Sequence, residues 1–167
     1  MILRKSSLAS LLFFLPLVFF SGCGDDEMIE NAKVPRLLVE TRGVNYGAPG
    51  GTVIILPVSG TQIAVQSDPL ITEFDIINVE LVKVDMGLAL LVQLSDAGAR
   101  QLYRASVTNM GGRIVLSING NAIGARRIDG AVQDGQFFTF VEVDDAELGD
   151  LVLDIKDTLA AIRKRGD

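Results

Sequence analysis

The clearest pattern of apolar and polar positions lies between residues 88 and 128, where the period changes twice. Residues 88–94 are a short apolar run, typical of a well-buried strand. After Ser95 the apolar positions recur at helical spacing, at Ala99, Leu102, Tyr103, Ser106, Val107 and Met110. Residues 113–118 then alternate, with Ile114, Leu116 and Ile118 on one face. The pattern therefore predicts a strand, an amphipathic helix and a second strand.

Cap and turn residues mark the limits of these elements. The hydroxyl of Ser95 can accept a hydrogen bond from the first turn of the helix. Gly111 and Gly112 supply the left-handed residue with which helices commonly end. Asn119 and Gly120 form a strong two-residue hairpin signal, because both residue types tolerate positive φ. We expect the return strand of this hairpin to begin at residue 122.

The flanking segments contain further strand patterns. We expect strands at residues 36–41, 52–56, 62–66 and 77–84, the last paired with 88–94 across the turn at residues 85–87. Residues 43–51 are rich in glycine, which raises the possibility of a phosphate-binding loop. They lack the Gly-Lys-Ser/Thr ending and lead into a strand instead of a helix, so a hairpin loop is the better interpretation.

The last third of the chain predicts one strand and one helix. Residues 136–143 alternate, with Phe138, Phe140 and Glu142 on one face and Phe137 on the other. A capping-box-like start at residues 144–147 precedes a helical stripe of Leu148, Leu151, Val152, Ile155, Leu159 and Ile162. These elements predict an α+β fold: an antiparallel or mixed sheet with two helices packed mainly on one face, and an N-terminal β-rich extension.

Residues 109–128 carry a family resemblance. The sequence Asn-Met-Gly-Gly-Arg-Ile-Val-Leu-Ser-Ile-Asn-Gly, continued by Asn-Ala-Ile-Gly-Ala-Arg-Arg-Ile, resembles the signature of the SecD head subdomain, the first periplasmic domain of the SecDF export subunit. There, a helix ending in Asn-Ile-Gly leads into a hydrophobic strand, a hairpin and a further strand. The resemblance spans roughly residues 63–162 and implies interaction with translocating polypeptides. Arg126 stands where the family usually has proline.

The N-terminus has the pattern of a signal peptide. Arg4 and Lys5 precede an uncharged apolar run at residues 8–20, and small residues then lead to Cys23, the only cysteine. This ending resembles the lipobox of bacterial lipoproteins, in which the thiol is acylated after cleavage. Ordinary cleavage that leaves a free thiol is the alternative. Gly24, by resemblance to lipoprotein sorting, favours the outer membrane over the inner membrane.

These patterns divide the chain into four parts. We expect a lipoprotein signal peptide at residues 1–22, an acidic tether at 23–35, an N-terminal β-rich part at 36–66 and a SecD-head-like domain at 67–165. Removal of residues 1–22 takes two of the 15 Lys and Arg and none of the 21 Asp and Glu, which leaves a net charge of −8. A negative net charge repels the phosphate backbone, which argues against binding nucleic acid.

The residues offer no evident catalytic constellation. Histidine is absent, which removes the commonest general base and metal ligand. Cys23 belongs to the predicted anchor, and the acidic residues are scattered among turns and helix starts. We therefore expect no enzymatic activity, no cofactor and no metal site. A hydrolase built on a serine–lysine pair or a carboxylate dyad is the less favoured alternative.

Phe137 and Phe138 suggest a binding surface, because adjacent residues of a strand point to opposite faces. Either both faces are covered, or Phe137, with Tyr103 or Val115 nearby, lines a groove for an extended or apolar peptide. The expected function is that of a lipid-anchored envelope protein with a non-catalytic module. This module binds polypeptide or a protein partner and has a link to protein export. The alternative is an assembly lipoprotein that recognises one envelope complex.

Overall fold

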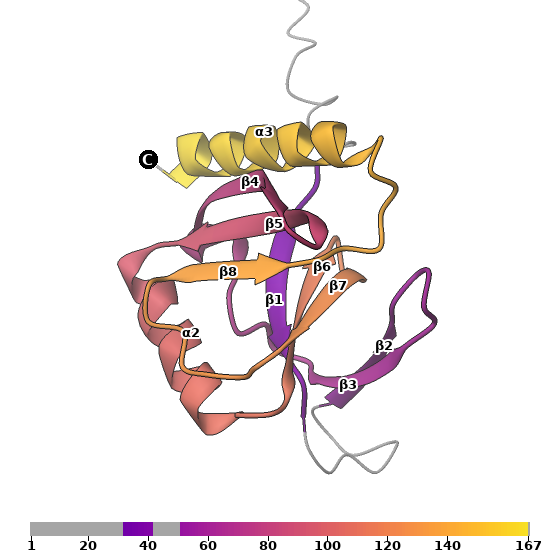
Figure 1. Cartoon of the computed structure of the whole chain (residues 1–167). Helices are drawn as coiled ribbons and strands as arrows, with labels where there is room; N and C mark the ends of the chain where they lie inside the picture. Colours follow the sequence, from indigo (N-terminus) through magenta and orange to yellow (C-terminus); the bar gives the residue numbers. More distant parts are fainter. Residues whose placement is uncertain (1–31, 42–50, 167) are drawn as a thin grey trace, which may run out of the picture.

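The computed structural model describes residues 32–41 and 51–166 (Figure 1). In this part of the chain the strands form three antiparallel sheets. The β6 sheet has the order β1-β6-β7, with β1 Pro35–Val39, β6 Arg113–Ile118 and β7 Asn121–Arg127. The β5 sheet has the order β4-β5-β8, with β4 Ile76–Val84, β5 Gly87–Leu94 and β8 Gln136–Thr139. The third is a hairpin of β2 Gly51–Ile55 and β3 Gln62–Gln66.

Two α-helices accompany these sheets in the described residues, α2 Asp96–Thr108 and α3 Leu148–Gly166, together with a short 3₁₀ helix, η1 Glu73–Asp75. Figure 1 shows α3 lying along β4 and α2 at the opposite end of the sheets. Both helices place apolar side chains in the same core, Leu102 from α2 and Ile155 from α3. The predicted α+β fold class is confirmed.

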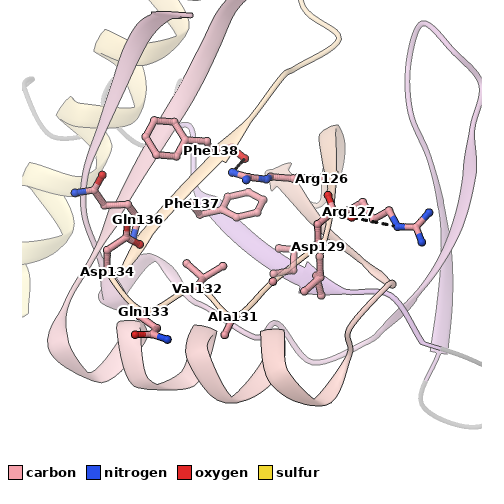
Figure 2. Close-up of a pocket in the computed structure, with 13 residues that line it drawn as sticks. Arg126, Arg127, Asp129, Ala131, Val132, Gln133, Asp134, Gln136, Phe137 and Phe138 are labelled. Carbon is pink, nitrogen blue, oxygen red and sulfur yellow. Dashed lines mark hydrogen bonds and ion pairs between the residues drawn. The ribbon is translucent and has the colours of Figure 1, made fainter.

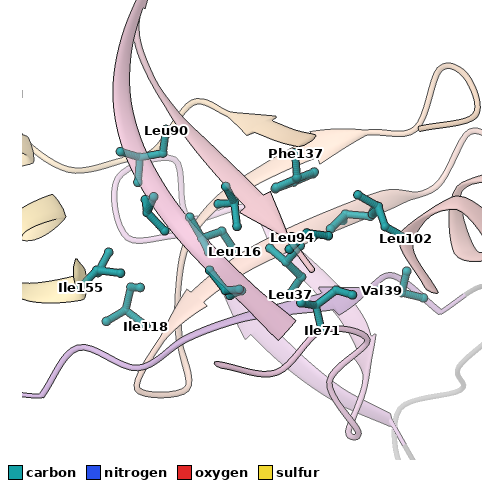
Figure 3. Packing of buried hydrophobic residues seen from close by; sticks show 14 of the residues in the cluster. Leu37, Val39, Ile71, Leu90, Leu94, Leu102, Leu116, Ile118, Phe137 and Ile155 are labelled. Carbon is teal, nitrogen blue, oxygen red and sulfur yellow. The ribbon is translucent and has the colours of Figure 1, made fainter. Parts of the chain in front are cut away.

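The main core lies between the inner faces of the β6 and β5 sheets (Figure 3). Leu37 of β1 and Leu90 of β5 are fully buried there, and Leu116 of β6 is 1% exposed. Burial of each such side chain contributes roughly 1.5–3 kcal/mol relative to exposure to water. The inner faces of the two sheets therefore supply most of the apolar burial of the domain.

A second core lies on the outer face of the β6 sheet. Val115 and Ala122 project to that face, and Ile54, Ile63 and Val65 of the β2–β3 hairpin cover them. β6 is consequently buried on both faces from Ile114 onward. This explains why its sequence is apolar at consecutive positions and does not alternate with polar residues.

The local signals at residues 88–128 are confirmed. The Ser95 hydroxyl accepts a hydrogen bond from the Gly98 amide at 3.1 Å, as expected of an N-cap. After α2, Gly111 takes the left-handed conformation with φ 78°. Asn119 and Gly120 have φ values of 51° and 82°, which form the tight turn between β6 and β7.

The buried face of α2 differs from the predicted stripe. Tyr103, Val107 and Met110 are 43%, 49% and 44% exposed, and the buried positions are Gly98, Leu102, Ala105 and Ser106. The cause is close packing at Gly98, where an added Cβ would lie 3.0 Å from the Asp75 Cβ. Small residues let the helix approach η1, so the helix is rotated toward its small side chains instead of its largest ones.

Two predicted elements have different limits in the structure. β8 ends at Thr139 instead of residue 143, because the chain leaves the sheet and Val141 forms an isolated bridge with Gly124 of β7. α3 begins at Leu148 after a turn in which the Asp144 carboxylate accepts from the Ala146 amide at 2.9 Å. Asp144 therefore stabilises the turn before the helix.

The N-terminal segments join the rest of the domain more closely than expected. β1 pairs along its whole length with β6, so residues 35–39 form one strand of the β6 sheet. The end of the expected tether is also attached, since the Lys33 amide donates to the Thr158 hydroxyl at 2.9 Å. The predicted signal peptide, Cys23 and the tether up to residue 31 lie outside the described residues, as do residues 42–50 of the predicted glycine-rich loop.

Candidate functional site

The two large sheets meet at their edge strands. β7 is the edge of the β6 sheet and β8 is the edge of the β5 sheet. They are joined by the isolated bridge of Gly124 with Val141 and by a hydrogen bond from the Glu142 amide to the Ile123 carbonyl. From this junction the two strands diverge, so that the end of β7 and the start of β8 lie apart (Figure 1). We call the space between them the seam.

Arg126 crosses the seam. Its Nη1 donates a hydrogen bond to the backbone carbonyl of Phe138 at 3.3 Å (Figure 2). In an antiparallel sheet the carbonyls of successive residues point to opposite sides, so Phe138 directs its carbonyl away from β5 and into the seam. A side chain therefore occupies a backbone acceptor that a neighbouring strand would otherwise use.

A cleft of about 460 Å³ with a polar rim opens on one side of the seam, and we call it the polar cleft (Figure 2). Its rim carries charged and amide side chains, and Ile114, Ile128 and Phe137 contribute to its lining. Arg127 and Asp129 form an ion pair at 3.4 Å on this rim, and both side chains are more than 70% exposed. An exposed pair of this kind contributes little to stability, because water and salt screen it.

An apolar cleft of about 590 Å³ shares Arg126 and Phe138 with the polar cleft. It lies at the outer face of the β5 sheet, and its lining consists of Val84, Asp85, Met86, Ala89, Ala125, Arg126, Phe138, Thr139 and Phe140. Met86 is 84% exposed, Phe140 44% and Val84 38%. Clustered apolar exposure bordered by polar groups is typical of a binding surface.

Local sequence explains how these side chains reach the surface. Asp85 and Met86 form the two-residue turn between β4 and β5, which places Met86 at the tip of the hairpin. Gly87 follows with φ 127°, a conformation that other residues rarely adopt. In β8, Phe138 is opposite Leu91 of β5, and alternation places it on the outer face of the sheet.

The three predicted contact residues do not form one surface. Phe137 is 2% exposed in the main core, and Val115 is fully buried in the second core. Tyr103 lies on a separate shallow depression of about 340 Å³ with Ala99, Arg100 and Gln133. The groove expected from Phe137 with Tyr103 or Val115 is therefore absent from the described residues.

Sequence reasoning missed Met86, Phe138 and Phe140. The alternation did place Phe138 and Phe140 on one face, but it could not say which face was outside. That choice is made by pairing with β5, where Phe137 is opposite the core residue Val92. At Met86 the sequence predicted only a turn. Its exposure could not be predicted, because it depends on how far the β4–β5 hairpin extends.

Hydrogen bonds explain the lowered pKa values of Glu73 and Glu142. The hydrogen bond from Arg36 lowers the pKa of Glu73, and hydrogen bonds from Ser59 and Val58 lower the pKa of Glu142. In the described part of the chain, no group of three or more acidic, cysteine or histidine residues is placed to hold a metal ion. Nor does any helix there combine the length and apolar character needed to cross a membrane.

Comparison with solved structures identifies the fold. A crystal structure of SecDF in its super-membrane-facing form matches with a TM-score of 0.57 and 14% identity, over 78% of this chain and 20% of that chain. A second match has a TM-score of 0.56 and 14% identity, over 86% of this chain and 72% of the other. Its title describes SecDF as a membrane component that enhances protein export.

The chain thus spans about a fifth of the length of the first SecDF structure. No model of a known protein family matches the sequence. No curated protein matches it either. The fold is SecD-head-like, as the resemblance in residues 109–128 predicted. At 14% identity, the similarity establishes the fold and leaves the activity to be argued from the site.

Proposed function

We propose that this protein is a lipid-anchored envelope protein whose SecD-head-like, non-catalytic module binds extended segments of polypeptide, in a role linked to protein export. The observation that carries the proposal is the apolar cleft beside the seam, where Met86, Phe138 and Phe140 line a surface at the edge of β8. The similarity to SecDF, a component that enhances protein export, supports the link to export.

The chemistry of the cleft suits ligands of varied sequence. Methionine is unbranched and polarizable, so it adapts to side chains of different shape. Burial of apolar area contributes roughly 25 cal/mol per Å² without directional requirements. A cleft that contains Met86 and two phenylalanines can therefore bind many apolar side chains with similar affinity. This tolerance is what binding to unfolded chains requires.

The anchor is proposed at Cys23, with the outer membrane favoured by Gly24. Each buried methylene of a lipid chain contributes about 0.8 kcal/mol, so two or more chains hold a protein stably at a membrane. Cys23→Ser should abolish incorporation of labelled lipid and release the protein from the membrane fraction. Retention of the variant with unchanged mobility would contradict the lipoprotein assignment.

The cleft is tested by placing charge in it. Met86→Asp and Phe140→Asp should each weaken binding of a permanently unfolded reporter protein by about tenfold or more, because a carboxylate must lose water when the ligand covers it. Leu153→Asp is the matched control, since Leu153 is 60% exposed on α3 and does not line the cleft. Equal binding by all three variants would sink the assignment of the cleft.

An assembly role is the second candidate, favoured by the position of β8 at the edge of its sheet. An edge strand can pair with one folded partner as well as with an unfolded chain. Crosslinking in intact cells separates the two functions. A polypeptide-binding module should capture unrelated unfolded proteins, whereas an assembly partner should recover one companion in fixed stoichiometry.

A further inference from the structure

We propose that Arg126 makes the seam selective for extended segments that carry a carboxylate beside their apolar residues. The inference rests on the proposed function, because it assigns the ligand chemistry of the same site. Its basis is the position of one guanidinium between β7 and β8, in contact with both the polar and the apolar cleft.

The first step concerns the backbone of β8. An extended segment that pairs with a sheet edge binds through the free N–H and C=O groups of the edge strand. On β8, the Phe138 carbonyl points into the seam and accepts from Arg126 Nη1 at 3.3 Å. An incoming strand must therefore displace Arg126 before it can use that carbonyl. Arg126 and the ligand backbone compete for one acceptor.

The second step concerns the charge that is displaced. Arg126 forms no ion pair with any described residue, whereas Arg127 on the same strand is paired with Asp129 at 3.4 Å. The nearby Asp134 carboxylate is turned to the backbone and accepts from the Gln136 amide at 3.1 Å. No ion pair therefore occupies the Arg126 guanidinium, which is available to a ligand carboxylate, while Asp85 and Asp134 line the two clefts beside it.

The third step is the resulting selectivity. A guanidinium can donate two parallel hydrogen bonds to a carboxylate, and such charged bonds are roughly twice as strong as neutral ones. A ligand with a carboxylate beside β8 gives Arg126 a better partner than the Phe138 carbonyl. A neutral ligand displaces Arg126 without offering this partner. The segment that binds best is therefore apolar at alternate positions, with an acidic residue at the seam.

The experiment uses two soluble capped peptides that alternate leucine and threonine and differ only in a central glutamate or glutamine. Affinities are measured for the wild-type protein, Arg126→Ala and Arg127→Ala. The wild type should prefer the glutamate peptide by about five- to tenfold. In R126A this preference should vanish. The glutamine peptide should bind R126A more tightly than it binds the wild type, because Arg126 no longer occupies the Phe138 carbonyl.

Arg127→Ala is the matched control, since it removes the same charge from the same strand. Arg127 is 71% exposed and its ion pair is with Asp129, so the preference for glutamate should persist. Loss of the preference in R127A as well would show a general field effect and overturn the inference. A weaker glutamine complex in R126A would also overturn it, because Arg126 would then be holding the seam together.

Failure of the inference is distinguishable from failure of the proposed function. If the wild type binds both peptides equally well, the seam binds polypeptide but Arg126 does not select for acid. If neither peptide binds to the wild type or to R126A, and Met86→Asp does not alter capture of the unfolded reporter, then the binding role of the cleft is wrong. Thermal unfolding of each variant verifies that the changes in affinity do not come from loss of the fold.

Discussion

The β6 and β5 sheets share one core but have different outer faces. Val115, on the outer face of the β6 sheet, is fully buried under the β2–β3 hairpin, where Ile63 is 1% exposed. On the outer face of the β5 sheet, Phe138 is partly exposed and Phe140 is 44% exposed. The outer face of the β6 sheet is thus apolar and has a covering hairpin, whereas that of the β5 sheet joins Phe138 to polar residues such as Asn78 and Gln93 and has no such cover among the described residues.

The effect of an apolar outer face depends on whether another part of the chain covers it. Covered by a hairpin, it becomes a second core and contributes to stability. An apolar surface that is left open stays in contact with water. The favourable free energy of burying it is then released only when a ligand covers the surface. We infer that the covered face of the β6 sheet adds to the stability of the domain, whereas the outer face of the β5 sheet adds less and carries the cleft of the proposed function.

The largest expected effect tests this division directly. Ile63→Ala removes a buried side chain from the second core and should lower the free energy of unfolding by about 2–5 kcal/mol. Phe140→Ala removes a larger side chain from the open face, and should cost no more than about 1 kcal/mol. Chemical denaturation measures both. Equal losses would mean that the two outer faces are equivalent.

A smaller effect is expected where the two sheets join. An added Cβ at Gly124 would clash with the carbonyl oxygen of Phe140 and lie 3.0 Å from Val141 Cγ1. Gly124→Ala should therefore lower the free energy of unfolding by about 1–3 kcal/mol and widen the seam. Gly130→Ala is the control, because its added Cβ would meet no atom within 4 Å. An unchanged midpoint for G124A in denaturant would show that the junction is not tightly packed.

The parts of the fold predicted from sequence are those with local causes. Ser95 caps α2 through an amide three residues away, and Asn119 with Gly120 forms a turn through its own backbone. Such signals lie within a few residues of the structure they determine. For this reason the succession of strand, helix, strand and hairpin at residues 88–128 could be predicted in full.

The candidate site could not be predicted, because its causes are distant in sequence. Whether Phe137 or Phe138 faces the core is decided by register with β5, more than 40 residues earlier in the chain. Likewise, β1 joins the domain through pairing of Leu37 with Leu116, which no local pattern indicates. The seam exists only because β7 and β8 belong to different sheets. Alternation in a single strand cannot reveal that arrangement.

The smallest predicted effect concerns how the covering hairpin is held. The Glu142 carboxylate, just after β8, accepts hydrogen bonds from the Ser59 amide at 2.9 Å and the Val58 amide at 2.7 Å, at the tip of the β2–β3 hairpin. Chiefly through Ser59, these bonds hold the pKa of Glu142 below its usual range. The group is partly exposed, so water competes and we expect at most about 1 kcal/mol from the contact.

The sign of the pH dependence follows from the lowered pKa. The contact contributes its full stability at every pH above the ordinary glutamate pKa, and loses it as the pH falls through the lower folded pKa. Glu142→Gln should therefore be less stable than the wild type at neutral pH, with a difference that shrinks in acid. Because Glu73 also titrates with Arg36 in both proteins, subtracting the two unfolding curves isolates Glu142. A difference that stays constant from neutral to acidic pH would mean that the charge of Glu142 does not hold the hairpin over the β6 sheet.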